Sequence, residues 1–154
     1  MDERTRQVLN SVSELPNFDG VDMADVNAIG FDGDNALHVV VGWGDLEAAK
    51  TLIDDGIDIN KPGDLGYTPL HVARMAGNLQ MVKLLIGKGA NLFALCEGYP
   101  PFTSARLAGK DEICDFLAPL MDEAVLRDPR IKLISRISEL RRELAELEAK
   151  LERS

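Results

Sequence analysis

The sequence predicts an all-α fold made of stacked helix-turn-helix repeats, and three observations lead to this prediction. The middle of the chain repeats at an offset of 33 residues, so that His38 recurs as His71. Apolar residues between the recurring glycines follow the three- and four-residue spacing of amphipathic helices. The chain then ends in a segment with a heptad pattern of leucines. A period in the low thirties is typical of solenoids, in which each unit buries its apolar face against its neighbours.

The repeat is defined by several matched positions. The pairs at an offset of 33 are Gly33 and Gly66, His38 and His71, Gly44 and Gly77, Leu52 and Leu85, and Gly56 and Gly89. A third copy follows at an offset of 32 and pairs Gly66 with Gly98, Leu70 with Phe102, Gly77 with Gly109, and Leu85 with Leu117. The change of offset indicates that one residue has been lost from a loop.

The second unit shows how each repeat is built. Thr68 and Pro69 suit an N-cap and the first helical position, so a short helix is expected to begin there and to end at Gly77. Residues 79–86 then have the spacing of a second helix. Gly89 permits a left-handed turn after that helix. The unit is therefore predicted to consist of a turn, two helices and a long loop.

At this level the chain resembles the ankyrin repeat family. The match is close from Gly66-Tyr67-Thr68-Pro69-Leu70-His71 to Gly89-Ala90-Asn91. The first unit has Asn35-Ala36-Leu37-His38 at the equivalent place, and the third has Pro100-Pro101-Phe102-Thr103, without the histidine. Ala24-Asp25-Val26-Asn27 resembles the end of a preceding partial unit. The resemblance covers roughly residues 22 to 121 and implies an ankyrin-repeat solenoid with short hairpin loops, a fold that serves as a binding scaffold for unrelated partners.

The two ends of the chain differ from the repeats. Residues 1–21 are predicted to hold a capping helix over 3–15, with an apolar stripe of Val8, Leu9, Val12 and Leu15 that covers the first repeat. The repeats are expected to occupy residues 22–121, with Pro119 interrupting the last repeat helix. Residues 122–128 are predicted to be a linker, and Asp128-Pro129 to start a helix within 129–154 that reaches about residue 152.

This last helix has an apolar seam with the alternating four- and three-residue spacing of a coiled coil. The leucine seam consists of Leu133, Ile137, Leu140, Leu144, Leu147 and Leu151. In a parallel pair Arg136 would face Arg141 and Glu143 would face Glu148, whereas an antiparallel pair that sets Leu144 against Leu147 brings Glu143 to Lys150 and Arg141 to Glu148. The pattern favours an antiparallel homodimer, and the alternative is a helix that folds back onto its own repeats.

Charge and composition limit the classes of partner. Residues 1–60 hold 13 acids and 3 bases, a net charge of −10, while the remainder holds 13 acids and 14 bases, a net charge of +1. The acidic half disfavours nucleic acid and favours a basic protein partner, although acids that only keep the chain soluble remain an alternative.

Apolar runs are too short for a membrane span, and Met1-Asp2-Glu3-Arg4 is unlike a secretory signal. Cys96 and Cys114 are expected to be reduced thiols in a cytoplasmic protein.

No catalytic motif is recognisable, so we expect neither enzymatic activity nor a cofactor or metal. Gly109-Lys110 fails as a phosphate loop because Ser104 stands at the position of the first glycine and Asp111 at that of the Ser or Thr. The resemblance implies that His38 and His71 have a structural role, in which histidines join neighbouring loops by hydrogen bonds.

The resemblance also implies where a partner binds, because turn tips and the ends of first helices line the concave side of ankyrin arrays. The positions that match are Phe31, Asp32, Asp34, Trp43, Asp64, Leu65, Tyr67, Met75, Glu97, Tyr99 and Leu107. Aromatic anchors beside carboxylates suit a partner that presents Arg or Lys. The expected function is a non-enzymatic protein-interaction module. Two alternatives are an acidic inhibitor or immunity-type protein that masks a basic toxin or enzyme, and a structural adaptor whose coiled-coil tail is the main binding element.

Overall fold

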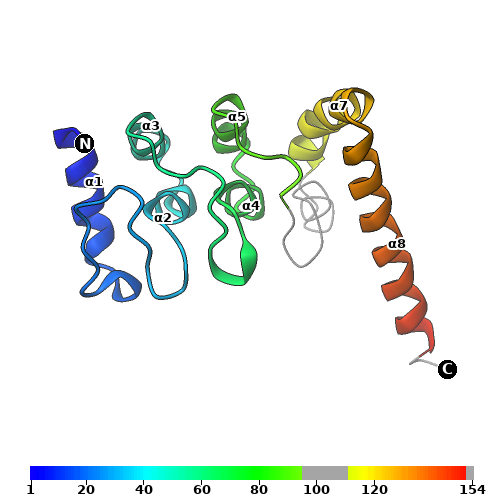
Figure 1. Cartoon of the computed structure of the whole chain (residues 1–154), viewed down its shortest axis with the longest axis horizontal. Helices are drawn as coiled ribbons and strands as arrows, with labels where there is room; N and C mark the ends of the chain where they lie inside the picture. The colour runs from blue at the N-terminus through cyan, green and yellow to red at the C-terminus, as the bar shows by residue number, and fades with distance from the viewer. Residues whose placement is uncertain (95–110, 152–154) are drawn as a thin grey trace.

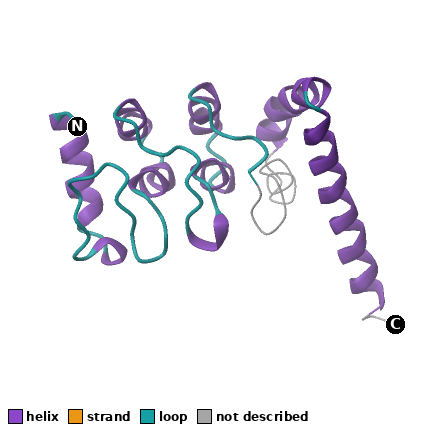
Figure 2. Ribbon diagram, in the orientation of Figure 1, coloured by secondary structure: helices purple, strands orange, loops and turns teal. Residues whose placement is uncertain are grey.

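The computed structural model describes residues 1–94 and 111–151 as paired helices joined by loops. Two layers of helices lie side by side along the array (Figure 1). The repeats contribute α2 (Ala36–Trp43) and α4 (Pro69–Met75) to the layer nearer the loops, and α3 (Leu46–Asp54) and α5 (Leu79–Gly87) to the outer layer. Figure 2 shows helices and loops throughout the described ranges, where the only β-pairing is an isolated bridge between Ile29 and Asn35. The all-α repeat fold predicted from the sequence is confirmed.

Short polar side chains set the start of each repeat helix, as the turn-helix-helix pattern predicts. The Asn35 side chain accepts hydrogen bonds from the N–H groups of Leu37 and His38 at the start of α2. Asp45 caps α3 and Asn78 caps α5 in the same way. Each such cap satisfies a backbone donor that the helix leaves unpaired and stabilises the helix by about 1 kcal/mol. Glycines in left-handed conformation then turn the chain between helices.

The core is one continuous apolar layer that runs the length of the array. It begins with Leu9 and Val12 near the N-terminus and ends with Ile113 and Leu117. Within the repeats the fully buried large apolar side chains are Leu37, Val40, Val41, Leu52, Leu70, Met81, Val82 and Leu85. Burying each such side chain stabilises the fold by about 1.5–3 kcal/mol. The repeat helices are too short to be stable alone, so this shared core holds them together.

The N-terminal helix α1 (Glu3–Ser13) covers the end of the array by packing against α2 and α3. A 3₁₀ turn, η1 (Pro16–Phe18), follows and buries Phe18. The N–H of Asp2 donates to the Asp55 carboxylate at 2.9 Å, which ties the start of α1 to the end of α3. The polar side chain of Thr5 and this N–H lower the pKa of Asp55. The capping helix therefore has both an apolar and a polar attachment.

The C-terminal end differs from the sequence prediction at Pro119 and in the linker. Helix α7 (Asp111–Arg127) runs through Pro119, so residues 122–127, predicted as linker, form its last turns. A proline removes only one helical hydrogen bond, and the strong helix formers after it, Leu120, Met121 and Ala124 among them, continue the helix. Asp128 alone separates α7 from α8 (Pro129–Leu151). The start predicted for the last helix agrees with the structure.

Helix α8 leaves the array rather than joining a layer. It turns back at Asp128 and runs past the level of the hairpin loops at the end of the stack (Figure 1). Its contacts with the described elements are made mainly with α7.

Candidate protein-interaction surface

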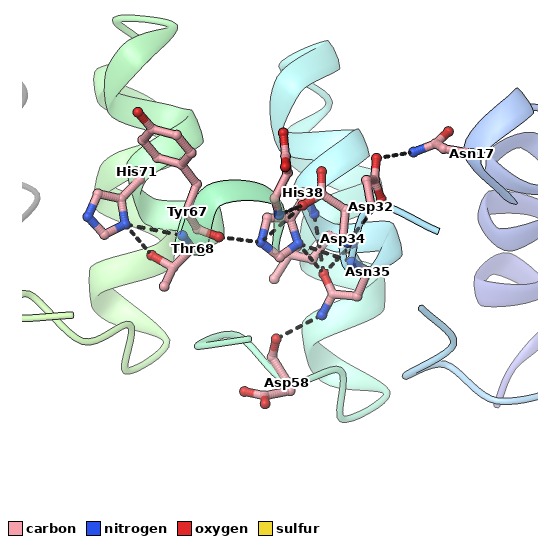
Figure 3. Close-up of polar contacts among 11 residues, drawn as sticks. Asn17, Asp32, Asp34, Asn35, His38, Asp58, Tyr67, Thr68 and His71 are labelled. Carbon is pink, nitrogen blue, oxygen red and sulfur yellow. Dashed lines mark hydrogen bonds and ion pairs between the residues drawn. The ribbon is translucent and has the colours of Figure 1, made fainter. Parts of the chain in front are cut away.

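His38 joins the first repeat to the second. Its ring Nδ1 accepts the Asn35 N–H at 3.2 Å, and its Nε2 lies 3.0 Å from the Tyr67 carbonyl oxygen of the next unit (Figure 3). Because a carbonyl oxygen only accepts, the hydrogen bond to Tyr67 requires a proton on Nε2. The imidazole therefore caps its own helix and holds the following hairpin.

His71 occupies the equivalent place in the second repeat. Its Nδ1 accepts the Thr68 N–H at 3.1 Å and lies 2.9 Å from the Thr68 hydroxyl. Its ring is fully buried, and the Tyr67 ring meets it edge-on with centroids 5.8 Å apart. The two histidines thus cap their own helices through Nδ1 in the same way in successive repeats. Tyr67, predicted to contact a partner, also packs within the array.

Two predicted partner-binding carboxylates are tied into the loops. Asp34 Oδ1 accepts the Asp64 N–H at 2.9 Å, which links two successive hairpin tips. Asp32 accepts hydrogen bonds from the Asp34 N–H and from the Asn17 side chain. A Cβ placed on Gly63 would lie 1.8 Å from Asp34 Oδ1, so only glycine fits there without moving that side chain. Asp32 and Asp34 therefore shape the hairpins.

A second set of hydrogen bonds joins the long loops, and the sequence reasoning missed it. Asn27 Oδ1 accepts the Asp58 N–H and Asn60 Oδ1 accepts the Asn91 N–H, both at 2.7 Å. The signal was available, because Asp25-Val26-Asn27 recurs as Asp58-Ile59-Asn60 at the repeat offset. We call these two bonds the asparagine ladder.

The family of the repeats follows from a match to known protein families. Residues 37–86, from α2 to the end of α5, match the family of ankyrin repeats in many copies. This part of the chain is an ankyrin-repeat array. No curated protein matches the chain in sequence. Ankyrin repeats are generally protein-protein interaction modules, which directs attention to the exposed surface of the array rather than to an enclosed cavity.

The structure places the predicted partner-binding residues of this ankyrin array on loops and helix ends. Phe31 and Leu65 at the hairpin tips are 79% and 67% exposed, and Trp43 and Met75 at the ends of α2 and α4 are each 52% exposed. Asp32 and Asp64 are exposed, while Asp34 and Tyr67 are half-buried. These eight residues are called the hairpin-side surface below. Glu97, Tyr99 and Leu107 lie outside the described residues.

The leucine seam of α8 is exposed to solvent along its whole length. Its six side chains, Leu133, Ile137, Leu140, Leu144, Leu147 and Leu151, have exposed fractions between 42% and 78%. Charges elsewhere on the helix pair along it, as in the contacts of Arg136 with Glu139 at 3.0 Å and of Arg142 with Glu146 at 3.9 Å. The seam is therefore an apolar face that the described part of the ankyrin array does not cover.

Among residues 1–94 and 111–151, no three His, Cys, Asp or Glu side chains are placed to hold a metal ion. None of the described helices is long and apolar enough to cross a membrane. A pocket of about 340 Å³ lies between α1 and the loop at Met23 and Ala24, away from the hairpin-side surface.

Proposed function

We propose that the chain is a non-enzymatic interaction module that binds a basic protein partner through the hairpin-side surface. The observation that carries the proposal is the exposure of four large apolar side chains at the hairpin tips and first-helix ends of two successive ankyrin repeats, namely Phe31, Trp43, Leu65 and Met75. Large apolar side chains left in water favour burial by a partner, and aromatic residues are the commonest anchors of such interfaces.

The charge around these anchors supports a basic partner. Asp32 and Asp64 stand next to Phe31 and Leu65, and the first 60 residues carry a net charge of −10. Such a field accelerates association with a cationic surface and repels anionic ones, including nucleic acid. Arg side chains on the partner suit this surface best, because a guanidinium can stack on an aromatic ring and pair with a carboxylate.

Leu65 gives independent support, because its backbone is held in a conformation that leucine disfavours. Its φ is 51° and its ψ is 15°, and among the described residues every other one with a positive φ is a glycine. A left-handed backbone costs a residue with a Cβ about 1–2 kcal/mol relative to glycine. An exposed leucine kept at that cost at a hairpin tip supports a role in binding.

The experiment separates binding from stability at this position. Leu65→Gly removes the apolar tip and relieves the backbone, so we expect unchanged or higher thermal stability together with weaker capture of the partner from an extract of the native host. Trp43→Ala combined with Leu65→Gly is expected to abolish capture. Leu46→Ala, an exposed apolar residue on the outer layer, is the matched control and is expected to retain the partner. Retention of the partner by the double variant would contradict the proposal.

We propose, second, that two chains associate through their α8 helices in antiparallel orientation. The specific observation is the exposure of the whole leucine seam, which supports self-association over folding back onto the repeats. Setting Leu144 against Leu147 of a second copy buries the C-terminal half of each seam and pairs Arg141 with Glu148. The leucines supply the stability of such a pair, and the exposed charges bias its direction by a few tenths of a kcal/mol each.

Light scattering at tens of micromolar tests this association. The intact chain is expected to be a dimer, and Leu140→Glu with Leu147→Glu a monomer. Arg141→Glu is expected to weaken the dimer, and Arg141→Glu with Glu148→Arg to restore it, because the swap preserves the antiparallel pair. A monomeric intact chain would refute the proposal, and a failure of the swap to restore association would refute the orientation.

The same variants distinguish the two remaining functions. An acidic inhibitor of a basic toxin or enzyme would lose its inhibitory effect with the hairpin-side substitutions and keep it when α8 is removed after Asp128. A structural adaptor that works through its tail would show the opposite pattern, losing its principal partner on that truncation.

A further inference from the structure

Helix α8 begins with a run of positive charge. Residues 130–137 hold three bases and no acid, and we call them the basic segment. The side chains of all three bases, Arg130, Lys132 and Arg136, are exposed. Arg136 pairs with Glu139 at 3.0 Å, whereas neither Arg130 nor Lys132 forms an ion pair with another described residue. Two positive charges of the segment are therefore compensated only by water.

The basic segment also carries the first apolar side chains of the leucine seam. Leu133 is 64% exposed and Ile137 is 42% exposed. The antiparallel pairing proposed above buries the C-terminal half of the seam, so Leu133 and the bases around it stay uncovered in that dimer. An apolar side chain surrounded by cations favours a partner surface that is both apolar and acidic.

The hairpin-side surface has that combination. Phe31 and Leu65 are exposed apolar anchors, and Asp32 and Asp64 stand beside them as exposed acids. Around the first hairpin, residues 16–45 hold six acids and neither lysine nor arginine. The first hairpin therefore has no lysine or arginine of its own to neutralise these acids, and a basic segment from elsewhere complements it.

The acidic surface that suits the basic segment belongs to another copy of the chain. Within one chain, α8 stands at the opposite end of the array from α1 and the first hairpin (Figure 1). Between two copies this separation imposes no restriction, because the anchors and charges of both surfaces are exposed. An anionic membrane is a less favourable target, since the chain has a net charge of −9 and is repelled by it.

We propose that the basic segment of one copy docks on the hairpin-side surface of a second copy. Leu133 packs against Phe31 and Leu65, and the bases on either side of it pair with Asp32 and Asp64. The inference rests on the proposed function of the hairpin-side surface, because it names this chain as one of the basic ligands of that surface. An outside partner then has to displace the basic segment, so the chain limits its own binding at high concentration.

Trp43 makes this contact measurable in the full chain. It is the single tryptophan, it is 52% exposed, and it belongs to the hairpin-side surface. Its emission maximum is expected to move to shorter wavelength as the protein is concentrated from a few micromolar to a few hundred micromolar, because docking removes water from the ring. Salt raised from about 0.05 M to about 0.5 M is expected to reverse the shift. Pairing of two α8 helices leaves Trp43 in water and produces no shift.

The deciding variant reverses the charge of the basic segment through Arg130→Glu, Lys132→Glu and Arg136→Glu. Each change replaces an attraction to the acidic surface by a repulsion. The association measured by the Trp43 shift is therefore expected to weaken about tenfold or more.

The matched control is Arg4→Glu with Arg6→Glu and Lys50→Glu. These changes alter the net charge by the same amount at exposed positions of α1 and α3, away from the basic segment. The control is expected to keep the concentration-dependent shift. Circular dichroism establishes that each variant compared is folded.

A synthetic peptide of residues 129–142 supplies the basic segment without the rest of a second copy. Added to the charge-reversed variant, it is expected to restore the shift of Trp43 to shorter wavelength. Trp43 emission that does not depend on the concentration of the unmodified chain would overturn the proposal, as would an equal shift in the charge-reversed variant. Cosedimentation with phosphatidylserine vesicles without any Trp43 shift would assign the basic segment to a membrane and overturn it as well.

Failure of this contact is distinguishable from failure of the proposed function. Capture of an outside partner that depends on Trp43 and Leu65, together with no Trp43 shift on concentration, would overturn the contact alone. A shift that the charge-reversed variant loses supports the contact even where no outside partner is captured.

Discussion

Helices α5 and α8 each carry an apolar stripe, but the stripe of α5 is buried in the array and that of α8 is exposed to solvent. In α5, Met81, Val82 and Leu85 are completely buried, because α3 and α4 pack against that helix. In α8, the leucine seam is 42% to 78% exposed, because among the described elements mainly α7 contacts it. An amphipathic pattern thus shows that a face needs a partner, and the position of the helix in the array decides whether the same chain provides it.

The largest expected difference is between two leucines, one from each helix. Leu85→Ala leaves a cavity in the core and is expected to lower the free energy of unfolding by about 2–5 kcal/mol. Leu144→Ala removes a side chain that already meets water and is expected to change it by less than about 0.5 kcal/mol. Urea unfolding of each variant, at a concentration where light scattering shows monomers, measures both. Equal losses would mean that the seam packs against the monomer after all.

Gly63 tests whether the hairpins are held as tightly as the helices. Gly63→Ala places a methyl group against the Asp34 carboxylate and disturbs its bond to the Asp64 N–H, so we expect a loss of about 1–3 kcal/mol. Gly87→Ala is the matched control in α5, where a Cβ meets nothing within 4 Å. Alanine is the better helix former, so that variant is expected to gain about 1 kcal/mol in thermal unfolding. A neutral Gly63→Ala would show that the hairpin tips adjust freely.

The asparagine ladder is expected to contribute less. Asn60→Ala removes the acceptor of the Asn91 N–H, and a loss of about 1 kcal/mol is expected for one exposed hydrogen bond between loops. Asn10→Ala, at an exposed position in α1, serves for comparison and is expected to be neutral or slightly stabilising. Chemical denaturation of the two variants measures the difference. If they unfold at the same denaturant concentration, the ladder does not stabilise the array.

The smallest effect concerns the attachment of α1 and disappears in acid. The pKa of Asp55 is lowered in the folded chain, so its ionised form stabilises the fold above 3.8, the ordinary pKa of an aspartate. That contribution is lost as the pH falls below 3.8 toward the lowered pKa. Asp55→Asn should therefore melt below the unchanged chain at pH 7, and the two melting temperatures should converge in acid. A constant difference across the titration would exclude a role for this carboxylate.

The sequence predicted the repeats well because their period fixes several positions at once. Glycines, caps and histidines recur at one offset, and each has a local physical reason to be where it is, as His38 and His71 show. Pro119 misled the prediction, because a proline was taken to end a helix whose flanking residues favour continuing it. The burial of Arg74 in the last turn of α4 could not be predicted, because arginine side chains ordinarily lie at the surface. The exposure of the leucine seam could not be predicted either, because a heptad pattern alone does not exclude a helix that folds back onto its own repeats.

The single residue between α7 and α8 has a consequence for geometry. A helix of 23 residues is stiff over about 35 Å, and a one-residue junction leaves it little freedom to swing. In the proposed antiparallel dimer, such helices would hold the two arrays at a fixed distance from each other. A target with two sites at that distance would bind both arrays at once, whereas a target with closer or wider sites would bind only one of them.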